Sequence, residues 1–326
     1  MNIKRLVSIL GSLLAVIGVV FLARRIVALE LWRQDVNFGE LAPVLALSAL
    51  AYALACLSLG GAWMVLLQPR GVSVRRGIAW HLAAQIGKYL PGNVAHFAGR
   101  HVMFARAGVP QPSLIKAAAG ETVLVVLAGL ILGVALSPQI AGTVADHLLP
   151  DAQLRWLAIA GIAALTVAIV GVLAWRLKRQ LRLSALAIAL VIYLVFFSIS
   201  GLALAALTHV LQPALGGHVA MFISAGSLAW LCGYLVPGAP GGLGIREAVL
   251  VLTLTPAVGA QAALLAALSH RAATIGGDGI AALAALIALR WTSGAQGLSG
   301  RGRVPSVPMP PGSLPVTGAR RVRAED

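Results

Sequence analysis

Apolar residues fill long uninterrupted runs of this sequence, and polar residues are concentrated in the shorter segments between them. A helix needs about 20 predominantly apolar residues to cross the hydrocarbon core of a bilayer. We therefore predict six membrane-spanning helices, near residues 6–23, 41–67, 113–136, 156–175, 184–208 and 259–292.

Two further apolar stretches, 78–107 and 218–256, are interrupted by proline and glycine. Because neither arm of either stretch reliably reaches the length of a span, we predict two re-entrant helical hairpins that enter and leave the membrane on the same side. A membrane tolerates broken backbone only where protein surrounds it or where it lines a watery cavity. The residues that break the helices are Pro91, Gly92, Pro237, Gly238, Pro240, Gly241, Gly242 and Gly244.

Composition supports the same class of protein. The 326 residues are 59% hydrophobic and only 11% charged, with a mean hydropathy of +0.91. Soluble domains contain about 25% charged residues. The composition therefore predicts an all-α polytopic membrane protein with about six spanning helices, and it argues against a soluble enzyme or a nucleic-acid-binding protein.

The net charge of +15 is spread along the chain and indicates topology. Loops on the cytoplasmic side of a membrane are enriched in lysine and arginine. With a cytoplasmic N-terminus, the basic clusters at 70–76 and 176–182 and the arginines after residue 300 all lie on the cytoplasmic side. Six spans also return the C-terminus there, so we predict that both termini are cytoplasmic.

The predicted elements repeat in order. Span, span, hairpin and span make up residues 1–136, and the same order recurs from the opposite side in residues 137–293. Such an inverted repeat occurs in alternating-access transporters, although an asymmetric bundle with the same order by accident is the alternative. We assign 1–293 as one transmembrane domain and 294–326, rich in proline, glycine and arginine, as a disordered tail.

The first hairpin carries fixed charge beside its break. Lys88 and Tyr89 precede Pro91 and Gly92, and a helix that begins near Asn93 points its positive end at the turn. Such an end binds phosphate or carboxylate. Arg100 lies two helical turns further on, on a similar face. The alternative for Lys88 is a side chain that extends to the lipid headgroups.

The second hairpin opens a helix with Arg246 and Glu247. Adjacent helical residues point about 100° apart, so these two charges do not simply neutralise each other. The substrate, Lys88, Arg271 or another carboxylate are candidate partners. A structural ion pair between Glu247 and Arg271 is the competing interpretation, and Arg271 lies too deep in the last apolar run to be ignored.

Two acidic residues inside predicted spans are further candidates, since charge within a membrane marks a functional site by default. Glu121 is a proton carrier or a counter-ion to one of the arginines, and Asp278 either hydrogen-bonds locally or faces a cavity. We find no catalytic motif and expect no enzyme activity, cofactor or metal site. Cys56 and Cys232 are expected to be free thiols.

The segments Gly87-Lys88-Tyr89-Leu90-Pro91-Gly92 and Pro240-Gly241-Gly242-Leu243-Gly244-Ile245-Arg246-Glu247 resemble the two motifs of the lysylphosphatidylglycerol synthase transmembrane (flippase-like) family. The resemblance covers about residues 1–292. It implies a stand-alone member in a bacterial-type cytoplasmic (inner) membrane that moves lipid between leaflets. We expect no synthase activity, because the sequence contains no soluble acyltransferase-like domain.

Four functions compete at this point. The first is flipping of an anionic or aminoacylated phospholipid, or of a polyprenyl-linked lipid, with the headgroup held by the basic residues of the two hairpins. The second is secondary transport of a small soluble anion. A membrane-embedded transferase is the third, with His81, His96 and Glu121 as its candidate groups. The fourth is a non-catalytic partner that recruits a glycosyltransferase or a lipid-modifying enzyme through the basic loop at 176–182.

Overall fold

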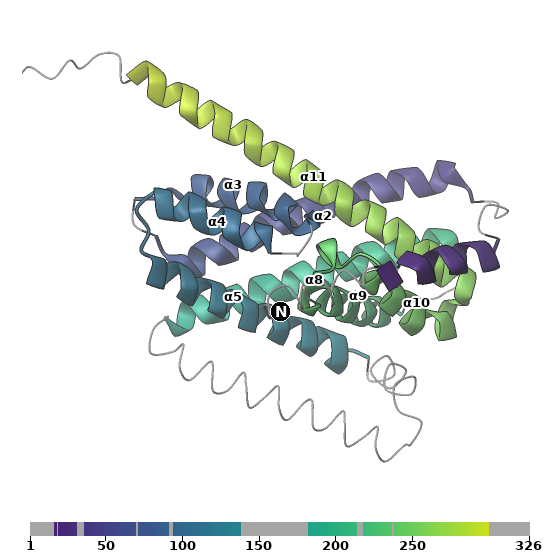
Figure 1. Cartoon of the computed structure of the whole chain (residues 1–326). Coiled ribbons are helices and arrows are strands. Elements are labelled where there is room, and N and C mark those ends of the chain that lie inside the picture. The colour runs from purple at the N-terminus through teal and green to yellow at the C-terminus, as the bar shows by residue number, and fades with distance from the viewer. Residues whose placement is uncertain are drawn as a thin grey trace, which may run out of the picture. The chain divides into compact units, whose positions relative to one another are not determined.

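The computed structural model describes residues 16–17, 19–30, 36–69, 71–90, 94–137, 182–213, 218–236 and 238–299. Most of the residues in these ranges are helical, and none of them forms a β-strand (Figure 1). The chain divides into two compact units, residues 1–289 and residues 290–326. The described part of the second unit, 290–299, is helical, and the site described below lies within the first unit.

Long apolar helices occupy four of the predicted spans. They are α2 (Phe38–Leu67), α5 (Gln111–Leu130) with its π-helical continuation η3 (Ile131–Ala135), α8 (Leu183–Leu211) and α11 (Ala260–Ser299). All four are long and apolar enough to cross a membrane. In the predicted run 6–23, residues 16–17 and 19–23 are helical, and the run 156–175 lies outside the described residues.

Both interrupted stretches fold as helix, break and helix, as predicted. The first comprises α3 (Val74–Gln85), η2 (Ile86–Tyr89) and α4 (Ala95–Arg106), and the second comprises α9 (Val219–Leu235), η4 (Pro240–Gly242) and α10 (Ile245–Val258). In each, the two arms pack against each other (Figure 1). Pro91, Gly92, Asn93 and Pro237 lie outside the described residues. Entry and exit on one side of a membrane stay a prediction.

The second hairpin differs from expectation in length. Residues Pro240–Val258 form a fifth stretch that is long and apolar enough to span, whereas we expected each arm to be too short. The regular helix α10 has 14 residues and is therefore about 21 Å long, less than the roughly 30 Å of the hydrocarbon core. The stretch reaches the length of a span only when the break η4 is included.

Glycine makes this second break possible. Gly241 and Gly242 have φ angles of +56° and +74°, a left-handed conformation that glycine adopts without the steric cost of a Cβ atom. The N–H of Gly244 then donates to the Glu247 carboxylate at 2.7 Å. That bond satisfies a donor at the start of α10 that would otherwise have no partner.

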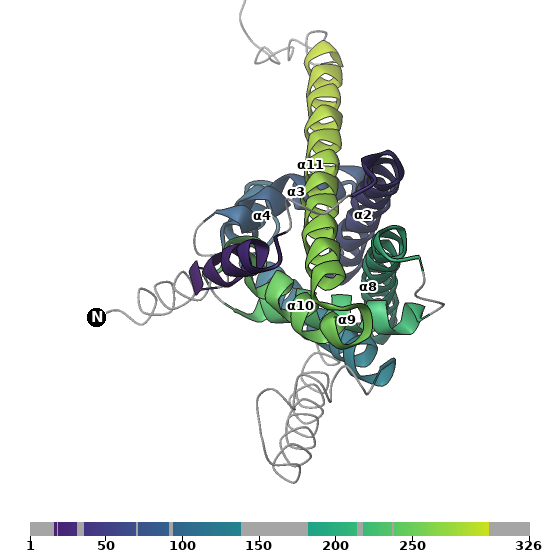
Figure 2. The same ribbon diagram turned by 90° about the vertical axis from the view of Figure 1, so that its right-hand side faces the viewer.

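Packing of the long helices brings the two breaks together. α2 packs along α8, and α8 packs along α9, as Figure 2 shows. Large aromatic side chains, including Tyr52, Trp63 and Phe196, are fully buried in the shared core. Within this frame η2 of the first hairpin contacts η4 of the second. The fold therefore places the short helices η2 and η4, one from each hairpin, side by side.

Helix α11 lies very close to α2 at Gly277. A Cβ atom there would lie 2.6 Å from the Ala49 carbonyl oxygen, whereas a Cβ atom at Gly279, two residues on, would meet nothing within 4 Å. Small residues are the usual means by which membrane helices approach each other closely. Gly277 thus sets the distance between α2 and the helix that carries Arg271 and Asp278.

We expect Gly277→Ala to destabilise the protein by about 1–3 kcal/mol, the usual cost of overpacking a tight contact. Gly279→Ala, the matched control, should leave stability unchanged or raise it by up to about 1 kcal/mol, because alanine favours helix over glycine. Thermal unfolding of the purified variants in detergent measures both. Equal midpoints for the two variants would contradict the close contact at Gly277.

Candidate functional site

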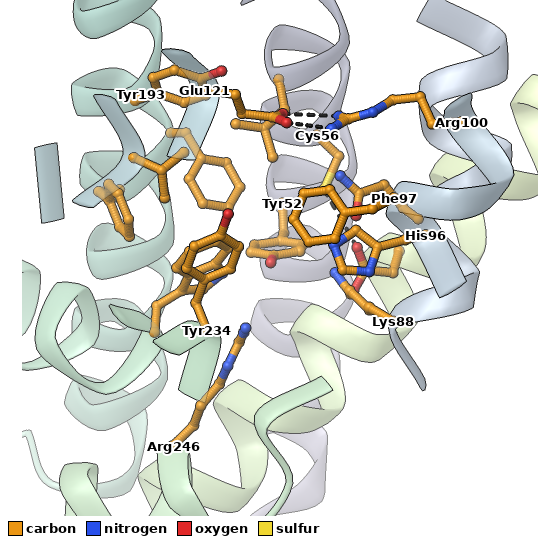
Figure 3. Close-up of a pocket in the computed structure, with 17 residues that line it drawn as sticks. Tyr52, Cys56, Lys88, His96, Phe97, Arg100, Glu121, Tyr193, Tyr234 and Arg246 are labelled. Carbon is orange, nitrogen blue, oxygen red and sulfur yellow. Dashed lines mark hydrogen bonds and ion pairs between the residues drawn. The ribbon is translucent and has the colours of Figure 1, made fainter. Parts of the chain in front are cut away.

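A buried cavity lies where the two hairpins meet, and Figure 3 shows its lining. Its interior measures about 50 Å³, room for roughly three or four water molecules. Residues of α2, α3, α4, α5, α8, α9 and α10 contribute, together with η2 and α11. The polar lining residues are Tyr52, Cys56, Gln85, Lys88, His96, Arg100, Glu121, Tyr193, Trp230, Tyr234, Arg246 and Asp278.

The first ion pair of the cavity joins Arg100 on α4 to Glu121 on α5. The guanidinium faces the carboxylate through both terminal nitrogens, with Nη1 2.9 Å from Oε1. Its carbon lies 3.6 Å from the centre of the Trp63 ring, and Nη1 is also 3.0 Å from Nδ1 of the buried His81. A two-pronged pair of this kind fixes orientation as well as charge.

The second ion pair joins the first hairpin to α11. Lys88 Nζ lies 2.7 Å from an Asp278 carboxylate oxygen, and the Tyr89 hydroxyl donates to the same oxygen at 2.5 Å. The Cys56 thiol on α2 approaches the other oxygen at 3.6 Å. Asp278 therefore faces the cavity, which settles the alternative left open by the sequence. Lys88 is held in this pair with its side chain 12% exposed, and it does not extend to a surface.

The third ion pair joins the second hairpin to the same helix. Arg271 Nε lies 3.1 Å from Glu247 Oε1, and Arg271 Nη1 donates to the Gly241 carbonyl at 3.0 Å. The other Glu247 oxygen accepts the N–H of Gly244. The structural pairing that the sequence offered as one interpretation is therefore present, and Glu247 also begins its own helix.

Arg246 is the basic residue of the cavity that has no ion pair among the described residues. Its guanidinium lies 4.9 Å from the Trp230 ring centre, and its Nε is buried without a hydrogen-bond partner. Gly233 and Gly242 flank it so closely that a Cβ atom on either would lie within 2.8 Å of the side chain. In Figure 3 the side chain points from α10 into the cavity.

Several polar atoms of the lining lack a partner. They are His96 Nδ1, Arg100 Nε, Tyr193 Oη, Trp230 Nε1 and Arg246 Nε. Buried polar groups in proteins nearly always have a hydrogen-bond partner. Because most of these atoms are donors, the cavity suits water or a ligand rich in acceptor oxygens.

A smaller space adjoins the cavity on the other side of Arg246. It measures about 10 Å³ and is lined by Arg246, Glu247, His270 and Arg271 with apolar neighbours. His270 Nε2 lies 3.1 Å from the Ser200 carbonyl oxygen and 3.3 Å from its hydroxyl. This space holds about one water molecule.

The structure brings most of the predicted site residues together. Lys88, Arg100, Glu121 and Arg246 line the main cavity, and Glu247 and Arg271 line the adjoining space. Tyr89 contacts Asp278 beside it. Asn93 lies outside the described residues, and α4 begins at Ala95 with Val94 in the N-cap position, close to the start that we expected near Asn93.

Three tyrosines of the cavity lining were missed by the sequence prediction, which among the tyrosines named only Tyr89 as a site residue. The chain has four: Tyr52, Tyr193 and Tyr234 line the cavity, and Tyr89 binds Asp278. Tyrosine in membrane proteins is usually enriched at the two membrane interfaces. Tyr52 and Tyr193 instead lie near the middle of long apolar helices. Their position inside two of the predicted spans is the sequence signal that could have identified them.

The described residues offer no group of three histidine, cysteine or acidic side chains that could hold a metal ion. Cys56 and Cys232 are free thiols, as predicted.

No protein-family model matches this chain, and no curated protein matches it significantly. The resemblance to the flippase-like family therefore rests on the two motifs alone.

We expect Glu121→Gln to destabilise the protein by about 3–5 kcal/mol, because it leaves Arg100 buried without its carboxylate. Arg100→Met combined with Glu121→Leu should recover most of this loss, since an apolar pair of similar volume often replaces a buried ion pair without cost. Unfolding in detergent, followed by tryptophan fluorescence, measures both variants.

Glu40→Gln is the matched control for this experiment, because Glu40 is exposed at the start of α2. A loss at Glu121 no greater than the loss at Glu40 would mean that the Arg100 pair contributes nothing to the fold.

Proposed function

We propose that this protein translocates a lipid with an anionic headgroup between the two leaflets of a membrane, and that the cavity between the two hairpins holds the headgroup. One observation carries the proposal. Arg246, on the second hairpin, points into a buried cavity beside Lys88 of the first hairpin and has no carboxylate partner among the residues that the structure describes.

Burial of an unpaired cation is costly, so such a group marks a place where an anion binds. The lining adds unpartnered donors on Tyr193 and Trp230. A phosphate group, with several acceptor oxygens and negative charge, matches both features.

The size of the cavity favours a headgroup over a whole amphiphile. A space of about 50 Å³ admits a phosphate but excludes acyl or prenyl chains. In our proposal the chains stay in the lipid while the headgroup passes between the hairpins. The resemblance of the two break motifs to the flippase-like family favours this reading.

Transport of a small soluble anion is the second candidate, since the same charges would hold it. In that case no lipid chain is required and the site opens only to water. The recruitment of a partner enzyme through 176–182 stays a prediction, because that loop lies outside the described residues.

We propose further that the two hairpins are equivalent elements of an inverted repeat. Each carries a basic residue at its break, Lys88 in one and Arg246 in the other, and η2 contacts η4. In such transporters the substrate site lies near the midplane, at the interface of the two repeats. Rocking of one half against the other would then expose the cavity to each leaflet in turn.

The test is translocation in vesicles. Purified protein in phosphatidylcholine vesicles should accelerate the exchange of fluorescent phosphatidylglycerol between leaflets, read as dithionite quenching. Arg246→Gln should slow this exchange at least about tenfold, the loss expected when one charge-assisted contact worth about 1.4 kcal/mol or more disappears. Arg246→Lys should retain part of the activity because it keeps the positive charge.

Arg75→Ala is the matched control, since Arg75 is exposed on α3, and it should behave as the wild type. Protein that carries radiolabelled glycerol phosphate into vesicles without moving labelled lipid would favour the soluble-anion transporter. Equal rates for vesicles with and without protein would rule out translocation of this lipid.

A further inference from the structure

We infer that the ligand of this cavity carries a single negative charge at a phosphodiester, as in a phosphatidylglycerol-type headgroup. The inference rests on the proposed function and narrows its substrate class. It excludes the dianionic phosphomonoester and diphosphate headgroups, and the headgroups whose added amine cancels the phosphate charge.

The argument begins with a count of charges. The cavity and the adjoining space are lined by four basic residues, Lys88, Arg100, Arg246 and Arg271, and by three acidic residues, Glu121, Glu247 and Asp278. Each acidic residue lies within ion-pair distance of one of the basic residues. One positive charge, that of Arg246, is left uncompensated.

The three ion pairs are not free to rearrange around a ligand, because residues of each pair also make other contacts that stabilise the fold. Glu247 accepts the N–H of Gly244, the residue that caps α10, and Arg271 donates to the Gly241 carbonyl. Asp278 accepts the Tyr89 hydroxyl as well as the lysine. Arg100 lies between Glu121 and the Trp63 ring. A ligand therefore meets one available cation rather than four.

A buried site binds best the ligand that makes it neutral, because uncompensated charge of either sign is costly away from water. A phosphodiester supplies one negative charge. A phosphomonoester supplies about two near pH 8, which leaves the site with an excess negative charge beside Glu121 and Asp278. A zwitterion brings a cation that has no free carboxylate to meet.

Direct binding tests this count without requiring translocation. Purified protein in an uncharged detergent at pH 8 is titrated with dihexanoyl phosphatidylglycerol, dihexanoyl phosphatidic acid and dihexanoyl phosphatidylcholine, and the thermal unfolding midpoint is recorded. We expect phosphatidylglycerol to bind at least about tenfold more tightly than either other lipid, a difference of about 1.4 kcal/mol. Phosphatidic acid has the smaller headgroup, so weaker binding of it cannot be attributed to size.

Charge variants make the test specific. Asp278→Asn frees Lys88 and adds a second uncompensated cation, so phosphatidic acid should then bind more tightly than phosphatidylglycerol. Arg246→Gln neutralises the site, so phosphatidylglycerol should bind no better than phosphatidylcholine. Glu40→Gln changes the same net charge outside the cavity and should keep the wild-type order.

The inference is overturned if wild-type protein binds phosphatidic acid or phosphatidylcholine as tightly as phosphatidylglycerol, or if neither cavity variant changes the order. A further titration with glycerophosphoglycerol, which has the same headgroup and no chains, distinguishes a lipid ligand from a soluble phosphodiester. Equal binding of this soluble compound would support the charge count and count against a lipid. Selective binding of phosphatidylglycerol without its translocation would overturn the proposed function and leave the inference standing.

Discussion

The cost of burying charge in an apolar bundle is the constraint on which this structure depends. An unpaired ion away from water is expensive enough that it must find a counter-ion or a ligand. Helix α11 supplies the ion-pair partner of a buried charge in each of the two hairpins. Arg271 and Asp278 lie seven residues apart, about two helical turns, and therefore share one face. Asp278 holds Lys88 of the first hairpin and Arg271 holds Glu247 and Gly241 of the second. Each hairpin is thus bound to the same helix through a charged residue.

This arrangement couples the two hairpins. Both are fixed to one helix through ion pairs and not through apolar contact alone, so movement of α11 relative to α2 displaces both breaks together. Gly277 lies next to Asp278 in sequence and packs closely against Ala49 on α2. Close packing at that point limits how far the helix can shift without separating the Lys88 pair. A transporter that changes which leaflet it faces needs such a link, because its two gates must not open independently.

Much of this organisation was readable in the sequence. Runs of apolar residues located α2, α5, α8 and α11, and proline with glycine located both breaks, because these signals depend on local chemistry. The partners of the charges were not readable. Asp278 lies 190 residues from Lys88, and pairing over that separation depends on how the helices pack. The same holds for Glu121 and Arg100, which could be proposed as partners but not assigned.

The tyrosines show why the pocket itself was harder to predict than its charges. A charged residue inside an apolar run indicates a functional site because lipid excludes charge. Tyrosine is amphipathic, so its presence in such a run gives no comparable signal. Yet a cavity that holds a polar group also needs walls that are apolar on one side and can donate a hydrogen bond on the other. Such walls are formed by Tyr52, Tyr193 and Tyr234. They surround the space into which Arg246 points, so a ligand there meets one cation within an aromatic enclosure. In that setting the low local dielectric strengthens the interactions of the one uncompensated charge, and in our proposal the three ion pairs around it determine which ligand charge the site accepts.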